Sequence, residues 1–236
     1  MTVDIKIPVG RVAVAADLRL PDSPYGIVVF AHGSGSSRRS PRNRMVADQL
    51  RTRRFGTLLA DLLSPDEEEL DRRTGELRFD IDLLCERVVG IIDQLARREE
   101  TAGLPVGLFG ASTGAAAALL AAARRPEVVR AVVSRGGRPD LAAAELAAVT
   151  APTLLIVGGA DVQVLELNRR AARQVRAVCR LHVVPGATHL FEEPGALEDV
   201  ADRAAEWFGI YLPPAAPDGD QTLLDGYPVS EDDRLG

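Results

Sequence analysis

Ser112 lies in the run Gly110–Gly114 (GASTG), which fits the pattern G-x-S-x-G. The run follows the apolar segment Val106–Phe109 and opens an alanine-rich segment that extends to Arg124. A serine exposed on a sharp turn from strand to helix needs small neighbours, because the strand and the helix pack closely there. The sequence therefore predicts that Ser112 is a nucleophile. The alternative is a plain turn between a strand and a helix.

His189 and Asp161 are the residues that could activate this serine. A serine hydroxyl is a poor nucleophile until a histidine takes its proton, and a carboxylate must hold that histidine in place. His189 lies in a glycine-containing loop after the last predicted strand, and Asp161 closes the run LIVGGAD at the end of another strand. We therefore expect a triad of Ser112, Asp161 and His189. Taken singly, Asp161 could instead cap the helix that follows it.

The other two of the three histidines fit the role of the base less well. His182 lies within the last predicted strand and is expected to be structural. His32 precedes Ser112, whereas the nucleophile-elbow arrangement has the chain order serine, acid, histidine.

An oxyanion hole needs two backbone N–H groups aimed at the carbonyl oxygen as it gains negative charge. We expect one from Thr113, the residue after the nucleophile, and the other from Ser34 in the loop after the third predicted strand. Gly33 and Gly35 flank Ser34, so the backbone could approach a substrate closely and contact it there. The alternative for this loop is a flexible turn.

Two groups of arginines follow predicted strands and could lie near Ser112. They are Arg38, Arg39, Arg42 and Arg44 after the third strand, and Arg135 and Arg138 after a later one. A guanidinium there would clamp a carboxylate or a phosphate, so Arg135 is a candidate contact for an anionic substrate. Ordinary surface ion pairs are the alternative, because all but one of the 28 basic residues are arginine.

Short β-branched segments alternate with longer segments rich in alanine, leucine and arginine, which predicts an α/β fold with a mostly parallel sheet and helices on both faces. The predicted strands are Thr2–Val9, Val12–Leu20, Ile27–Ala31, Gly56–Leu63, Val106–Phe109, Val128–Ser134, Pro152–Val157 and Arg180–Val184. The first two strands, joined near Gly10, are expected to be antiparallel. The predicted helices cover residues 43–54, 80–98, 113–124, 141–148, 163–177 and 196–210, and Asp66–Thr74 is a short surface helix or a loop.

Residues 1–212 are expected to form one domain. Pro213–Gly236, rich in proline and acids, is expected to be a tail without structure of its own. Only the 17 residues Arg135–Ala151 separate two predicted strands at the place where a helical cap is usually inserted. We therefore expect no cap domain and an open site.

Four segments resemble the dienelactone hydrolase family of α/β-hydrolases. They are Phe30–Ser37 (FAHGSGSS), Gly110–Gly114 (GASTG), Leu155–Asp161 (LIVGGAD) and Pro185–Phe191 (PGATHLF). The resemblance covers most of residues 26–210 and implies an α/β-hydrolase fold without a lid that hydrolyses carboxylic esters or lactones. By position it implies Ser112 as the nucleophile, Asp161 as the acid and His189 as the base.

The family's namesake enzymes use a cysteine nucleophile, so Ser112 makes the chain more similar to the generic esterase branch. The chain also resembles hydrolase domains found fused to phosphoribosyltransferases. Because of the serine, the substrate and the activation mechanism of the namesake enzymes do not carry over.

The composition excludes several classes of protein. No run of about 18 apolar residues could cross a membrane. We expect no signal peptide, because an acid and a base interrupt the apolar residues at the start. A net charge of −6 argues against binding nucleic acid. Cys85 and Cys179 cannot form a disulfide framework and have no metal-ligand spacing, so we expect a cytoplasmic protein without a metal or cofactor.

The sequence therefore predicts a serine hydrolase that cleaves small carboxylic esters or lactones, some of them anionic, through an acyl-enzyme. A thioesterase, an amidase or peptidase, or an acyltransferase would use the same triad, and the sequence does not separate them. A binding module without turnover is a third possibility, although no member of the triad is missing.

Overall fold

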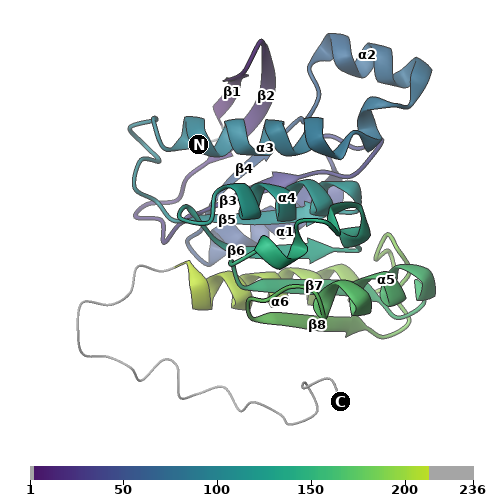
Figure 1. The fold of residues 1–236 in the computed structure, drawn as a ribbon. Helices are drawn as coiled ribbons and strands as arrows, with labels where there is room; N and C mark the ends of the chain where they lie inside the picture. Colours follow the sequence, from purple (N-terminus) through teal and green to yellow (C-terminus); the bar gives the residue numbers. More distant parts are fainter. Residues whose placement is uncertain (1–2, 213–236) are drawn as a thin grey trace.

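The β-branched segments form one eight-stranded sheet in the computed structural model, which describes residues 3–212 (Figure 1). The strands are β1 (Val3–Val9), β2 (Val12–Arg19), β3 (Ile27–Ala31), β4 (Gly56–Ala60), β5 (Val106–Ala111), β6 (Val129–Arg135), β7 (Thr153–Gly158) and β8 (Cys179–Val184). Their order across the sheet is β1-β2-β4-β3-β5-β6-β7-β8.

Six of these strands, from β4 to β8 across the sheet, are parallel neighbours. The hairpin of β1 and β2 is antiparallel, as expected, and β2 is also antiparallel to β4. Every residue of β3, β4, β5 and β7 is buried, because helices cover both faces of the parallel part. The predicted α/β-hydrolase sheet is confirmed, and the carboxyl ends of its parallel strands meet at one edge.

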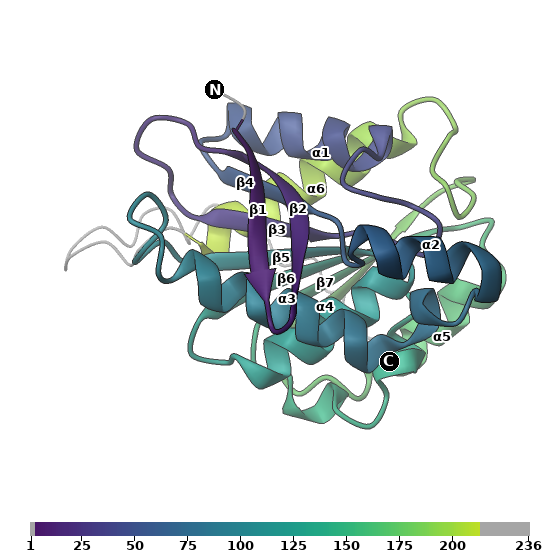
Figure 2. The same ribbon diagram turned by 90° about the horizontal axis from the view of Figure 1, so that it is seen from above.

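Two helical layers cover the sheet (Figure 2). One layer holds α1 (Pro41–Thr52) and α6 (Ala196–Tyr211). The other holds α3 (Ile81–Leu95), α4 (Thr113–Arg124) and α5 (Val162–Ala172). The segment that the sequence left as helix or loop forms the helix α2 (Pro65–Thr74), which begins with a capping box between Ser64 and Glu67.

The segment between β6 and β7 holds two 3₁₀ turns, η2 (Pro139–Ala142) and η3 (Leu146–Ala148), where one helix over 141–148 was predicted. That prediction was wrong because Leu146 and Val149 are drawn into the core, so the chain bends between the two turns. A third 3₁₀ turn, η1 (Leu77–Phe79), precedes α3. Nothing larger than these turns is inserted after β6, so the expected absence of a cap is confirmed.

Helix α5 ends at Ala172, five residues before the predicted end, since turns then bring Val175 into the core. No helix within residues 3–212 is long and apolar enough to cross a membrane. The tail predicted over Pro213–Gly236 lies outside the described residues.

Candidate active site

Ser112 lies alone between β5, which ends at Ala111, and α4, which begins at Thr113. Its φ of 51° and ψ of −120° are unusual for a residue with a side chain, so the turn is strained. A Cβ on Gly110 would lie 2.4 Å from Cα of Ala115. A Cβ on Gly114 would lie 2.3 Å from the carbonyl oxygen of Ala31. The tight packing explains why the serine is flanked by glycines.

The loop after β6 is fastened to this turn by the backbone. The N–H of Ser112 donates to the carbonyl oxygen of Arg135 at 3.2 Å, and the N–H of Arg138 donates to the carbonyl oxygen of Ser112 at 3.1 Å. The buried amide of Asn168 in α5 donates to the carbonyl oxygen of Gly137 at 2.9 Å. Asn168 was not singled out from the sequence, although a polar residue on the apolar face of a helix was the available signal.

His189 and Asp161 are hydrogen-bonded to each other at 2.7 Å between Nδ1 and Oδ2. Asp161 holds the N-cap position of α5, but its side chain makes no capping hydrogen bond. The carboxylate is therefore available to orient the imidazole, as the triad hypothesis requires. The imidazole is half-buried, with 39% of the side chain exposed, so a substrate could reach it.

The loop after β6 also brings the histidine to the serine turn. A Cβ on Gly136 would lie 3.5 Å from Cε1 of His189, and the neighbouring Arg135 accepts the N–H of Ser112. Gly136 has a φ of +52°, so the chain turns sharply there beneath the imidazole. Ser112 and His189 therefore both contact the stretch Arg135–Arg138, and Asp161 is joined to them through His189.

The expected oxyanion loop lies against the same turn. A Cβ on Gly33 would lie 3.0 Å from Cβ of Ser112, which explains the glycine. The N–H of Ser34 donates to the side-chain hydroxyl of Thr113 at 2.9 Å. Ser34 and Thr113 therefore meet beside the nucleophile. An oxyanion would have to share the Ser34 N–H with that hydroxyl or displace it. Gly35 follows with a φ of +68°, near Arg78 rather than Ser112.

His32 holds this loop to the neighbouring strand. Its Nε2 accepts from the N–H of Leu62 at 3.1 Å, and its Nδ1 lies 3.0 Å from the carbonyl oxygen of Gly33. Burial lowers the pKa of His32, although the bond to Gly33 and the charge of Asp61 act the other way. The neutral imidazole therefore serves as a structural bridge.

Most of the arginines near the site have acidic partners. Arg38 is bonded to Asp61 and Asp17, and Arg44 to Asp17. Arg138 is bonded to Asp140 through two nitrogens, at 2.8 and 2.7 Å. Arg135 differs from them because its guanidinium is buried and meets no carboxylate among the ion pairs of residues 3–212. Within the same residues, no group of three or more His, Cys, Asp or Glu side chains could hold a metal ion.

Comparison with known proteins identifies relatives of two lengths. The chain is 56% identical to a dienelactone hydrolase of Anabaena variabilis of known crystal structure, with a TM-score of 0.89 over 90% of this chain and 98% of that one. It is 57% identical over 216 residues to a Mycobacterium tuberculosis protein provisionally named a phosphoribosyl transferase. That match covers 92% of this chain and 48% of the relative, so the chain spans about half the length of such relatives.

More distant structures share the fold. A serine hydrolase without a lid from Xanthomonas campestris is 18% identical and superimposes with a TM-score of 0.71, over 92% of this chain and 97% of that one. The family model described as "Dienelactone hydrolase family" matches residues 14–211. This chain therefore belongs to the dienelactone hydrolase family.

Proposed function

We propose that the protein is a serine hydrolase of carboxylic esters or lactones. The observation that carries the proposal is the hydrogen bond between Asp161 and His189, next to a serine held in a strained turn at the carboxyl edge of the sheet. That edge is where the sites of open α/β sheets gather. The family shown above supports a hydrolase, and the ester specificity is our inference.

In this mechanism His189 takes the proton of the Ser112 hydroxyl while the oxygen attacks the carbonyl carbon of the ester. Asp161 holds the imidazole by its Nδ1 and stabilises the positive charge that develops on it. The N–H groups of Thr113 and Ser34 receive the negative oxygen, and the Ser34 N–H leaves the Thr113 hydroxyl to do so.

The protonated His189 then gives its proton to the departing alcohol, and an acyl-enzyme on Ser112 remains. Water takes the place of the alcohol, loses a proton to His189 and attacks the acyl carbon. The bond from the acyl carbon to Oγ of Ser112 then breaks, and His189 returns the proton to Oγ, so that the acid leaves and the serine is restored. No step needs a cofactor. A site without a cap suits small esters or exposed chains, and only the two 3₁₀ turns stand where a cap would be.

The name of the Mycobacterium tuberculosis relative describes a protein of about twice this length. We do not extend a transferase activity to this chain, since the residues argued above match acyl transfer to water. A thioesterase or an amidase would use the same residues, so the test must compare bonds.

The test is the hydrolysis of p-nitrophenyl acetate, butyrate and octanoate, and of matched thioesters and anilides, by the wild type and by Ser112→Ala. We expect ester turnover to fall by about 10³-fold or more in the variant, with an unchanged circular dichroism spectrum. We also expect a fluorophosphonate to label the wild type at Ser112 alone. Equal turnover by both proteins would remove Ser112 as the nucleophile.

A further inference from the structure

The guanidinium of Arg135 is buried beside the Ser112 turn without a counter-charge. The side chain closes β6 on the face that carries α1 and α6, and the residue is 7% exposed. One nitrogen, Nη2, donates to Oδ1 of Asn43 at 3.3 Å, while Nε–H has no hydrogen-bond partner within residues 3–212. A buried charge whose partners are a neutral amide and the face of the Phe191 ring still lacks a carboxylate, which calls for an explanation.

The surroundings of this guanidinium are positive as well. Burial and the neighbouring charge of Arg42 lower the pKa of Arg135 to about 10. Arg42 and Asn43 lie in the first turn of α1, where the helix dipole is positive and no acidic residue stands. The Arg42 guanidinium, whose Nε is also buried without a partner within residues 3–212, and the first turn of α1, which the Ser40 side chain caps, lie beside Arg135, and their positive charge favours an anion.

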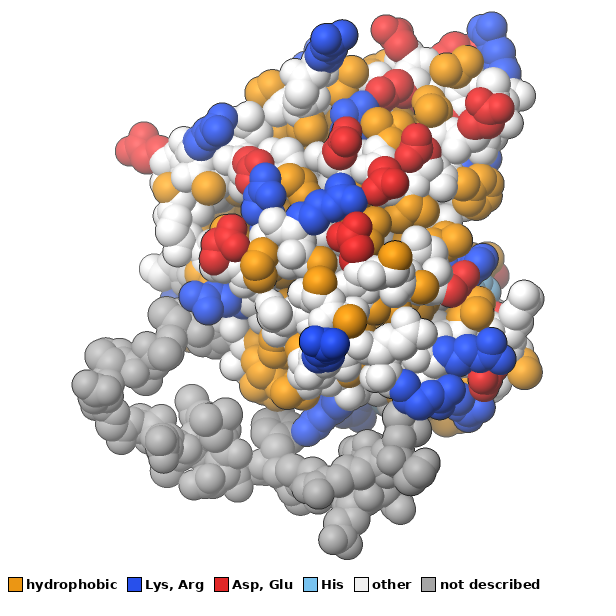
Figure 3. Space-filling model, in the orientation of Figure 1, with side chains coloured by type: hydrophobic (Ala, Val, Ile, Leu, Met, Phe, Trp, Pro, Cys, Tyr) orange, Lys and Arg blue, Asp and Glu red, His pale blue; other side chains and the backbone are white. Residues whose placement is uncertain are grey.

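The nearby carboxylates have other partners. Glu192 binds Arg42 at 3.2 Å, and Oε1 of Glu193 accepts from both the N–H and the hydroxyl of Thr188. Asp161 is bonded to His189. On the face seen in Figure 3, basic and acidic side chains lie next to each other. Arg124 is paired with Asp82, and Arg125 with Asp93. Arg135 therefore differs from Arg42, Arg124 and Arg125, each of which has a carboxylate partner.

Arg135 is bonded to Ser112 through its backbone, and its side chain lies over a ring close in sequence to His189. Its own carbonyl oxygen accepts the N–H of Ser112 at 3.2 Å. Its Cζ lies 5.8 Å from the centre of the Phe191 ring, two residues beyond His189. An anion at this guanidinium would therefore lie within a small molecule's length of the serine and the histidine.

We propose that Arg135, with Arg42 and the N-terminal turn of α1, forms an anion subsite that binds a carboxylate or phosphate carried by the ester substrate. The inference rests on the proposed function, because it concerns the substrate of the same site. A carboxylate or phosphate offers several oxygens to a planar guanidinium and would supply the acceptor that Nε–H lacks. The subsite orients the ester so that its carbonyl carbon faces Ser112.

The test compares esters that differ only in charge. On the alcohol side, 3-acetoxybenzoate and 3-acetoxyphenyl phosphate are compared with the neutral 3-acetoxybenzamide. On the acyl side, monophenyl adipate is compared with its terminal amide. For at least one pair we expect the wild type to have a kcat/KM about tenfold or more higher for the anion. The pair that shows the preference identifies the group and the side of the ester on which it lies.

Three variants should abolish this preference while the neutral esters are still turned over. Arg135→Gln removes the charge, and Arg42→Gln removes the second, less buried guanidinium. Asn43→Asp places a carboxylate next to Arg135, where it pairs with the guanidinium in place of the substrate anion. This variant should therefore lose the preference for anionic esters, and its melting temperature should not fall. Arg170→Gln is the control, because Arg170 is an exposed arginine of α5 paired with Glu166.

A wild type without preference for any anionic ester would overturn the subsite, as would a preference that survives both Arg135→Gln and Asn43→Asp. If Arg135→Gln fails to fold, the other two variants decide. If no ester is turned over, the proposed function fails. In that case a melting-temperature increase with 3-hydroxybenzoate or inorganic phosphate that Asn43→Asp removes would still support the subsite, and its absence would overturn it.

Discussion

The molecule contains two histidine–aspartate pairs with the same hydrogen-bond length of 2.7 Å, His189–Asp161 and His182–Asp199. The first joins two loops at the carboxyl edge of the sheet, and the second joins the edge strand β8 to α6. Asp199 also meets Arg203 at 3.4 Å, so its charge is shared between two partners.

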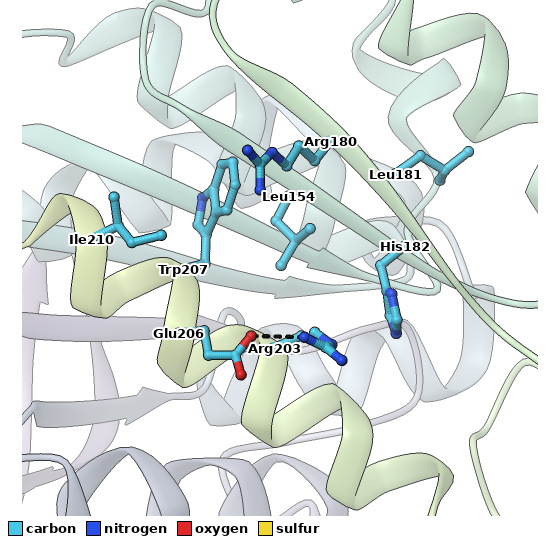
Figure 4. A pocket seen from close by; sticks show the side chains of 8 residues that line it. All are labelled: Leu154, Arg180, Leu181, His182, Arg203, Glu206, Trp207 and Ile210. Carbon is cyan, nitrogen blue, oxygen red and sulfur yellow. Dashed lines mark hydrogen bonds and ion pairs between the residues drawn. The ribbon is translucent and has the colours of Figure 1, made fainter. Parts of the chain in front are cut away.

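The surroundings of the two pairs differ more than their geometry does. His182 lines a cavity of about 320 Å³ between β8 and α6, where it points toward the helix (Figure 4). The cavity is lined by Leu154, Arg180, Leu181, His182, Arg203, Glu206, Trp207 and Ile210. None of these is a serine, threonine or cysteine. A hydrogen bond to a carboxylate therefore does not make a histidine a catalytic base: the strained Ser112 turn beside His189 is what the second pair lacks.

The largest expected effect is the difference in kcat between variants of the two histidines. His189→Gln removes the proposed base, so we expect kcat for p-nitrophenyl butyrate to fall by about 10³- to 10⁵-fold. His182→Gln leaves the reacting groups in place and should change kcat by less than about twofold. Steady-state kinetics of both variants, with melting temperatures to verify folding, provide the measurement. A loss of the same size in both would mean that the second pair is also needed for turnover.

The two aspartate variants should also differ in kcat, but by less than the two histidine variants. Asp161→Asn keeps the size of the side chain but loses the charge that stabilises the imidazolium, and we expect kcat to fall by about 10²- to 10⁴-fold. Asp199→Asn should leave kcat unchanged and lower the free energy of unfolding by about 1–2 kcal/mol, because it weakens hydrogen bonds to His182 and Arg203. Urea unfolding and kinetics on the same preparations test both statements.

The sequence was sufficient to predict the parts of the site that depend on local pattern. The run Gly110–Gly114 predicted a strand, a turn and a helix, and the structure has β5, Ser112 and α4 there. Asp161 and His189 were assigned from their places at strand ends, and parallel strands bring such ends to one edge. All eight strands were predicted, and β3, β4, β5 and β7 are the fully buried ones that appear as continuous apolar runs. The strand predicted over Gly56–Leu63 ends earlier, at Ala60.

The remaining features depend on contacts between distant segments. The place of Asn168 on an apolar helix face indicates a buried amide, but its partner Gly137 does not follow from the local sequence. The contact between Asn43 and Arg135 joins residues 92 positions apart and has no local signal. The hydrogen bond from the N–H of Ser34 to the hydroxyl of Thr113 was also not predicted, because Thr113 was considered only for its backbone N–H. The prediction of one helix over 141–148 was wrong, because its apolar residues lie in two separate turns.

Substitutions at two glycines test whether the tight turn around Ser112 is what distinguishes the pair His189–Asp161. A methyl group at Gly114 would lie 2.3 Å from the carbonyl oxygen of Ala31, so Gly114→Ala should lower the free energy of unfolding by about 1–3 kcal/mol and reduce activity. Gly209 in α6 has nothing within 4 Å of such a methyl, and Gly209→Ala should raise the free energy of unfolding by about 0.5–1 kcal/mol. Equal effects would contradict the packing argument.

The smallest expected effect concerns His32, the third histidine, and the dependence of stability on pH. Burial lowers the pKa of His32 from the usual value of 6.5, so below pH 6.5 the unfolded chain binds a proton that the folded chain does not. The contribution of His32 to stability is therefore present above pH 6.5. As the pH falls below that value it is lost, with a slope of at most about 1.4 kcal/mol per pH unit.

His32→Gln replaces the imidazole with an amide whose oxygen can still accept the N–H of Leu62 but which does not titrate. The free energy of unfolding, measured in urea between pH 5 and pH 7.5, should fall less steeply toward low pH in this variant than in the wild type. Parallel curves for the two proteins would show that His32 is not the titrating group.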